Sequence, residues 1–222
     1  MKKLRRVNHD LFDTFAAAMP LTFLEGVKSV MHQLYEEAHH AMHQDPLLGS
    51  PEAAYATPHY RRALIETRLR QEAQKSGLAA TVQTNSAQSA EFTAIKAANF
   101  VITESFVNQP SGRVRYAKFR QDYCALNKLL SQMPIEGIDT SEMLTYTDGA
   151  VYCIMLHGPD FHDRSKLGFV DWAFPDHNNR RYVDIFSLDE LVLAARARTV
   201  ITQVDSAHAK LKARKTGKGG TS

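Results

Sequence analysis

Residues 143–190 constrain the fold more than any other part of the sequence, because strand and turn signals alternate along them. Residues 167–174 and 182–186 are rich in β-branched and aromatic side chains, and the intervening run 175–179 consists of turn-forming residues. Ser187 and Glu190, three positions apart after the second stretch, have the pattern of a helix-capping box. The segment therefore predicts two strands joined by a turn and followed by a helix.

A further pair of strands is predicted ahead of these two. Residues 143–146 and 151–156 flank Asp148-Gly149, and Asp-Gly between strand-like runs is typical of a two-residue hairpin turn, because both positions tolerate positive φ. This hairpin would pair Tyr146 with Val151. Residues 143–190 are therefore expected to form a β-meander that runs directly into a helix.

The first half of the chain is expected to be mainly helical. Apolar residues recur at helical spacing before Pro20, over residues 22–44, and from Thr57-Pro58 to residue 76. Residues 78–84 and 92–107 are typical of strands, and helical spacing returns over residues 116–130.

This order of elements favours an α+β fold, in which a helical N-terminal part packs with a mainly antiparallel sheet, and a C-terminal β-meander is followed by a helix. We expect one domain over residues 1–209, helical over 11–76, mixed over 78–132, and meander plus helix over 143–204. Residues 210–222 are expected to form a flexible basic tail.

Charge is unevenly distributed along the chain, which has a formal net charge of +3. Nine of the 27 Lys and Arg residues lie before residue 7 or after residue 209, and all 24 Asp and Glu residues lie between, which leaves 18 basic against 24 acidic residues in the body. The basic tail is either a solubilising terminus or a source of non-specific phosphate contacts. The body of the chain is therefore acidic and its two ends are basic.

Two basic clusters within the body are candidates for a phosphate-binding site. The nucleic-acid-binding candidates are Arg113, Arg115, Lys118 and Arg120, and a second group on a predicted helix comprises Arg61, Arg62, Arg68 and Arg70. If the two clusters converge on one surface, they can hold a phosphate backbone. Tyr116 and Phe119 are assigned to a core stripe, so exposed aromatic residues are not expected beside them. The alternative is a pair of solvated faces with acidic partners.

Asp171 and Asp184 are the candidate catalytic residues. Side chains alternate along a strand, so Trp172 faces the core; if Ile185 shares that face, the two carboxylates lie together on the other one. Paired acids can bind a divalent cation or divide acid and base roles. The alternative is an ordinary solvated sheet face.

A histidine-rich stretch supplies the metal-binding candidates. His32, Glu36, His39 and His43 occupy one narrow arc of the helix predicted over residues 22–44. Imidazole and carboxylate groups ligate zinc and iron, but one helix spreads these four over about 16 Å, so other elements would have to complete any site. A polar helix flank is the alternative interpretation.

Two functions remain open on the sequence alone. The first is a cytoplasmic, non-catalytic binding or regulatory protein that engages a protein or nucleic-acid partner. The second is a metal-dependent phosphodiesterase or nuclease that uses Asp171 and Asp184, with Glu66 or Glu104 as a third acid. The sequence contains no Walker A loop, GxGxxG, GxSxG or HExxH motif, which favours the first function. It also has no run of eighteen apolar residues, so no membrane association is expected.

Overall fold

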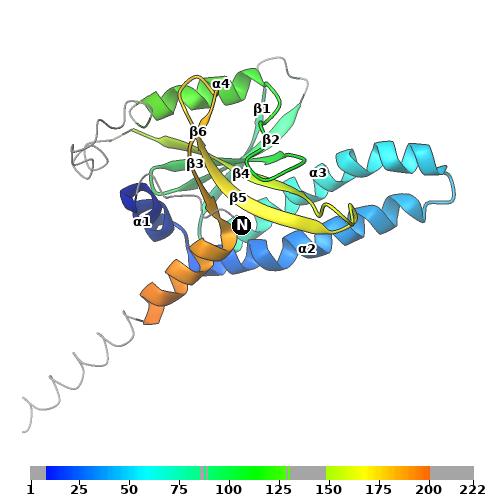
Figure 1. The fold of residues 1–222 in the computed structure, drawn as a ribbon, viewed down its shortest axis with the longest axis horizontal. Coiled ribbons are helices and arrows are strands. Elements are labelled where there is room, and N and C mark those ends of the chain that lie inside the picture. Colours follow the sequence, from blue (N-terminus) through cyan, green and yellow to red (C-terminus); the bar gives the residue numbers. More distant parts are fainter. Residues whose placement is uncertain (1–8, 86–87, 89, 129, 131–148, 201–222) are drawn as a thin grey trace, which may run out of the picture.

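The computed structural model describes residues 9–200, apart from 86–87, 89, 129 and 131–148. Their architecture is an α+β fold in which helices cover both faces of one sheet (Figure 1). Helices α1, α2 and α3 lie on one face together with a final helix over residues 188–200, and α4 lies on the other face. The predicted fold class is confirmed.

In the described part of the chain, the sheet has six strands whose spatial order is the same as their order in the sequence. The strands are β1 (Ala79–Thr84), β2 (Glu91–Ala97), β3 (Phe100–Phe106), β4 (Val151–Pro159), β5 (Leu167–Pro175) and β6 (Tyr182–Ser187). Neighbouring strands pair antiparallel, with the exception of β3 and β4, which are parallel. The chain between β3 and β4 is therefore a crossover connection.

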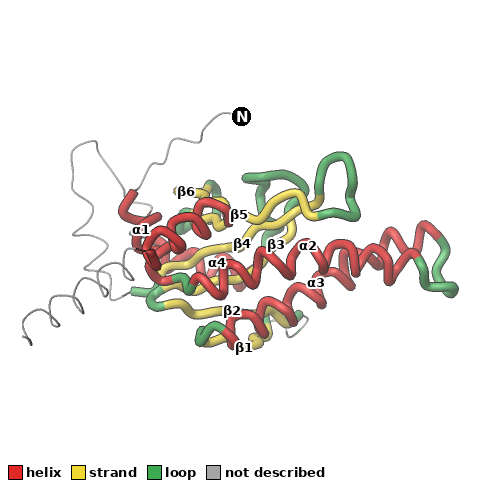
Figure 2. Tube along the Cα trace, turned by 90° about the horizontal axis from the view of Figure 1, so that it is seen from below, coloured by secondary structure: helices red, strands yellow, loops and turns green. Residues whose placement is uncertain are grey.

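The helices that precede the sheet form a layer beneath it. They are α1 (His9–Ala18), α2 (Leu21–His43) and α3 (Ser50–Lys75), whereas the crossover contains α4 (Lys118–Cys124) and the short 3₁₀ helix η1 (Ala125–Lys128). Figure 2, which is seen from below, shows α2 and α3 side by side in front of the sheet, with the turn that joins them projecting beyond the strands. The first half of α3 lies next to the ends of β3 and β4, with which it lines a pocket.

Helix α3 begins earlier than its sequence predicts. The predicted start at Thr57-Pro58 is wrong, because the helix begins at Ser50 and contains Pro58 in its interior. Pro51 occupies a first-turn position where a missing N–H costs nothing, and the Thr57 hydroxyl donates to the Ala53 carbonyl oxygen at 2.6 Å. Packing of α3 against α2 thus outweighs the local break that Pro58 introduces.

The meander is confirmed in its described part. Strands β5 and β6 match their predicted ranges to within one residue, and β4, β5 and β6 pair consecutively. The capping box is also present, because the Ser187 hydroxyl accepts the Glu190 N–H at 3.2 Å and the Ser187 N–H donates to the Glu190 carboxylate at 3.2 Å. Residues 143–146 of the predicted hairpin lie outside the described residues, and Val151 pairs with Phe100.

The main core lies between the sheet and the helical layer. Its centre is Phe15 of α1, whose ring lies 5.0 Å from that of Phe100, 5.5 Å from that of Trp172 and 5.1 Å from that of Phe174. All four side chains are buried. Helix α1 is thus held to the sheet by aromatic contacts.

A smaller core lies on the opposite face, beneath α4. The buried side chain of Asn127 ties η1 to this face by accepting the Tyr152 N–H (2.7 Å) and donating to the Tyr152 and Pro175 carbonyl oxygens (both 2.8 Å). Asn127 therefore satisfies backbone groups at the ends of β4 and β5 that the sheet leaves unpaired. In the part of the chain described here, no helix has the length and apolarity needed to cross a membrane.

Candidate functional site

A broad groove of about 1010 Å³ opens between α3 and the crossover segment of residues 115–120. The first half of α3 forms one wall, residues 115–120 form the other, and the ends of β3 and β4 contribute to its floor. We call this feature the groove. Its volume is well above that of two other clefts in the described part of the chain, which measure about 260 Å³ each.

Five cationic side chains line the groove. Both walls contribute them: Arg61 and Arg62 from α3, and Arg115, Lys118 and Arg120 from the crossover segment. Glu104 supplies the one carboxylate among the described lining residues. The two basic clusters found in the sequence therefore converge in part, since Arg61 and Arg62 meet three of the four crossover candidates.

Several of these cations are not neutralised by nearby acids. Lysines elsewhere, such as Lys28 with Asp189 and Lys75 with Glu72, form ion pairs at 2.6 and 2.7 Å. Among the described residues, by contrast, no acidic side chain forms an ion pair with the crossover cations that line the groove. Their charge is thus available to an anionic ligand.

Exposed aromatic side chains accompany the cations. Tyr55 on α3 is 76% exposed, Tyr116 on the opposite wall is 79% exposed, and Phe106 lies at the end of β3. The assignment of Tyr116 to a core stripe is wrong, because α4 begins at Lys118 and Tyr116 belongs to the non-helical chain ahead of it. Phe119 packs differently, with its ring stacked 4.0 Å from the buried ring of Phe92.

The floor of the groove contains a buried chain of hydrogen bonds. His157 Nε2 lies 2.9 Å from Glu104 Oε2, and His157 Nδ1 lies 2.7 Å from the Tyr35 hydroxyl. Because an ionised carboxylate only accepts, Nε2 carries a proton, and in the neutral ring Nδ1 accepts from Tyr35. Both nitrogens of His157 are therefore engaged within the protein.

Arginines flank this chain on the side of α3. Arg62 Nε lies 3.7 Å from Glu104 Oε1, and the guanidinium of Arg61 lies 4.1 Å from the centre of the Tyr35 ring. Arg61 is only 6% exposed, and its Nε has no hydrogen-bond partner among the described residues. Burial accordingly lowers the pKa of Arg61, although its contact with Tyr35 opposes this effect.

Two carboxylates beside the floor have opposite pKa shifts. Burial raises the pKa of Glu66 to about 7, and the charge on Glu104 adds to this shift. Burial would also raise the pKa of Glu104, but its hydrogen bond and charge interaction with His157, together with Arg62, outweigh that effect and lower it. Glu66 is held in place by the Thr93 N–H, which donates to Glu66 Oε2 at 2.6 Å. Glu66 therefore takes up a proton close to neutral pH, while Glu104 remains ionised.

The raised pKa of Glu66 predicts how stability depends on pH. Because the folded protein binds this proton more tightly than the unfolded chain, the contribution is complete below about pH 4.5 and is lost as pH rises towards about 7. We expect the free energy of unfolding to fall by about 1–3 kcal/mol across that window. Urea denaturation at several pH values measures this dependence.

The matched control is Glu66→Gln, which resembles the protonated carboxyl in shape and hydrogen bonding. Its stability should change less between pH 5 and pH 7 than that of the wild-type protein, and the buried carboxyl of Asp171 accounts for part of the change that remains. Equal slopes in the two proteins would show that Glu66 does not carry this proton.

The predicted carboxylate pair does not form. Asp171 lies opposite Ser187 and Asp184 lies opposite Phe174, so the two acids lie on opposite faces of the sheet. The prediction of a shared face is wrong because Phe186, and not Ile185, takes the inner position opposite Trp172. Its ring packs 5.2 Å from that of Phe174 in the main core. Burial, together with the charge of Glu190, raises the pKa of Asp171 to about 6.

The histidine-rich arc lies along α2, as predicted, but its members are spread along the helix. His32 lies beside β5, whereas the rings of His39 and His43 stack 4.0 Å apart further along. Within the described residues, no group of three or more His, Cys, Asp or Glu side chains is arranged to hold a metal ion. No other element in the described part of the chain therefore supplies the ligands that would complete a metal site with His32, Glu36, His39 and His43.

Arg113 is the one crossover candidate that lies away from the groove, in a separate cleft next to Arg180.

Comparison with known proteins assigns the chain to no family, because no family model, curated protein or solved structure matches it. The functional argument therefore depends on the groove and its side chains.

Proposed function

We propose that the protein is a non-catalytic binding protein that holds a single-stranded nucleic acid in the groove. The observation that carries this proposal is the meeting of Arg115, Tyr116 and Lys118 with Tyr55 and Arg62 across one concave surface. Proteins that bind single strands combine a positive groove, which follows the phosphates, with aromatic faces on which bases stack. A duplex has its bases stacked inside and cannot use these faces.

The floor of the groove supports binding in preference to catalysis. A general base needs a free lone pair within reach of a substrate proton, but the ring nitrogens of His157 already contact Glu104 and Tyr35. Glu104 is likewise engaged by His157 and Arg62. The alternative nuclease function loses its geometric basis, since Asp171 and Asp184 lie on opposite faces of the sheet. We therefore assign the floor to the positioning of the arginines.

Fluorescence anisotropy with labelled oligonucleotides tests this function. Wild-type protein should bind single-stranded DNA or RNA in a saturable and salt-sensitive manner, and bind a blunt duplex more weakly. The double variant Arg115→Ala/Lys118→Ala should reduce the slope of log K against log salt by about 1.4, because about 0.7 is lost per single-strand phosphate contact. Arg196→Ala is the matched control, since Arg196 pairs with Glu25 away from the groove.

Stacking is tested separately from charge. Tyr116→Ala should weaken binding of a single strand by about 5- to 150-fold, which corresponds to about 1–3 kcal/mol of lost stacking. Tyr116→Phe retains the aromatic face and should bind nearly as tightly as the wild-type protein. If neither single-stranded DNA nor RNA binds at low salt, the proposed function fails, and a protein partner becomes the occupant to seek.

A further inference from the structure

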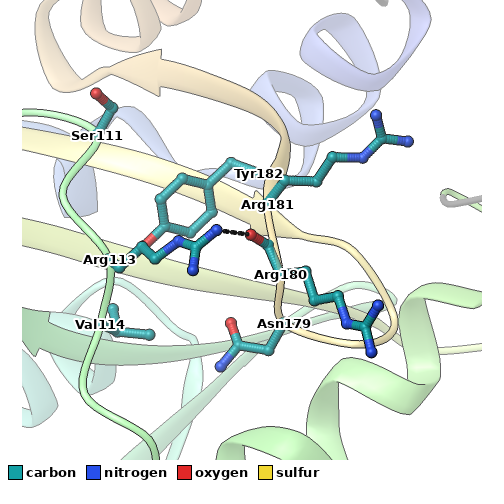
Figure 3. A pocket seen from close by; sticks show the side chains of 7 residues that line it. All are labelled: Ser111, Arg113, Val114, Asn179, Arg180, Arg181 and Tyr182. Atoms are coloured by element: carbon teal, nitrogen blue, oxygen red, sulfur yellow. Dashed lines mark hydrogen bonds between the residues drawn. The ribbon is translucent and has the colours of Figure 1, made fainter.

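A second basic surface lies next to the groove, in the cleft that contains Arg113. The cleft measures about 260 Å³ and lies between residues 111–114 and the turn that joins β5 to β6 (Figure 3). Its lining residues are Ser111, Arg113, Val114, Asn179, Arg180, Arg181 and Tyr182. We call it the arginine cleft, because three of these seven residues are arginines.

The turn on one side of the arginine cleft is held in a fixed shape by Asp176. The Asp176 carboxylate accepts the Arg180 N–H at 2.7 Å, and the Asp176 carbonyl oxygen accepts the Asn179 N–H at 2.9 Å. Asn179 adopts a left-handed conformation with φ of 54°, which asparagine tolerates better than most residues. Two hydrogen bonds to Asp176 therefore support the turn that presents Arg180 and Arg181, and the side chains of both arginines are exposed.

Hydrogen bonds across the arginine cleft join its two sides. Arg113 Nη2 donates to the Arg180 carbonyl oxygen at 2.9 Å, as Figure 3 shows, and the Tyr182 hydroxyl donates to the Gly112 carbonyl oxygen at 2.9 Å. The first bond uses one of the five N–H donors of the Arg113 guanidinium and leaves the others for a ligand. Arg181 lies 4.0 Å from Asp176, but within the described chain neither Arg113 nor Arg180 forms an ion pair.

The arginine cleft continues the basic surface of the groove. Only Val114 separates Arg113 in the cleft from Arg115 in the groove, so their Cα atoms lie at most about 7 Å apart. Arg120, which lines the groove, acts on the same tyrosine as Arg113: burial raises the pKa of Tyr182, and both guanidinium groups oppose that rise. A series of cationic side chains therefore extends from α3, across the crossover segment, to the turn between β5 and β6.

We propose that the arginine cleft binds further phosphates of the same strand that occupies the groove, so that the preferred ligand is an oligonucleotide spanning both sites. This inference rests on the proposed function and specifies its ligand. A mononucleotide carries its phosphates at one place and cannot reach both surfaces, whereas a strand of several nucleotides can. Longer strands should therefore gain affinity from Arg113 and Arg180, while the shortest ones should not.

A length series of labelled oligothymidylates, from about 3 to about 15 nucleotides, tests this inference by fluorescence anisotropy. With wild-type protein, affinity should rise with length until both surfaces are occupied. The variant Arg113→Ala/Arg180→Ala should bind the shortest strands as the wild-type protein does but lose about tenfold in affinity for the longest ones. The salt slope of the longest strands should fall by about 1.4, as expected for two lost phosphate contacts.

Two comparisons separate failure of this inference from failure of the proposed function. Arg115→Ala/Lys118→Ala should weaken strands of every length, because those residues line the groove. If the cleft variant loses no affinity at any length, the arginine cleft is not part of the site, although binding in the groove stands. If no strand binds the wild-type protein, the proposed function itself is overturned. Circular dichroism of each variant verifies that it is folded.

Discussion

Replacement of His157 by leucine is expected to lower the free energy of unfolding by about 3–5 kcal/mol, because it removes the partner of a buried charge. Glu104 loses its 2.9 Å hydrogen bond to the imidazole, and the Tyr35 hydroxyl loses its own 2.7 Å bond. Both groups are buried and cannot turn to bulk water. Chemical denaturation near pH 8, where the proton on Glu66 contributes little, measures the loss.

A double-mutant cycle identifies the cause. His157→Leu/Glu104→Met should be more stable than His157→Leu alone, since the buried carboxylate that loses its imidazole partner is then absent. Strictly additive effects would show that the Glu104–His157 contact contributes little. His40→Leu serves as the matched control, because His40 is an exposed residue of α2 and its replacement should change stability by no more than about 0.5 kcal/mol.

Phe15→Ala is expected to cost about 3–5 kcal/mol, the usual range for truncation of a buried phenylalanine. Its ring contacts the rings of Phe100, Trp172 and Phe174, so its removal leaves a cavity where α1 meets the sheet. Thermal and urea denaturation report the loss. Phe161→Ala is the control, because Phe161 is 92% exposed and should change stability by about 0.5 kcal/mol or less. Equal effects of the two substitutions would contradict the assignment of the main core.

The sequence identifies strands far better than it identifies how they pair. Strands β5 and β6 were predicted almost to the residue, because β-branched and aromatic residues cluster between clear turn signals. Alternation shows which residues of one strand share a face, but not which residues of the neighbouring strand share that face with them. In the structure, Trp172 pairs with Phe186, whose ring packs against Phe174, and this register places Asp171 and Asp184 on different faces of the sheet.

The buried pair on the floor of the groove had a signal in the sequence that was not recognised. Glu104 has the same strand parity as the core residues Phe100 and Ile102, and His157 has the same parity as Cys153 and Met155. A charged or titratable residue on an apolar face indicates a buried polar contact. The pairing itself could not be predicted, because it depends on the parallel register of two strands that are distant in sequence.

The cations of the groove were predictable from the sequence, but their arrangement around it was not. Both basic clusters were recognised as candidates, but only the packing of α3 and the crossover segment around the strand ends shows that they face each other. The stacking surface was missed for a local reason. Helical spacing was extended to Tyr116, whereas the helix starts two residues later and leaves that ring in solvent.

The parallel pairing of β3 and β4 has a consequence for the order of folding. Strands β1 and β2 close a loop of six residues, whereas β3 and β4 can pair only after the 44 residues between Phe106 and Val151 have closed. That longer closure costs about 2 kcal/mol more in chain entropy. We therefore expect the β1–β3 and β4–β6 units to form early and to join late in the folding reaction. Because the crossover carries Arg115, Tyr116 and Lys118, the proposed binding surface should be completed only in that last step.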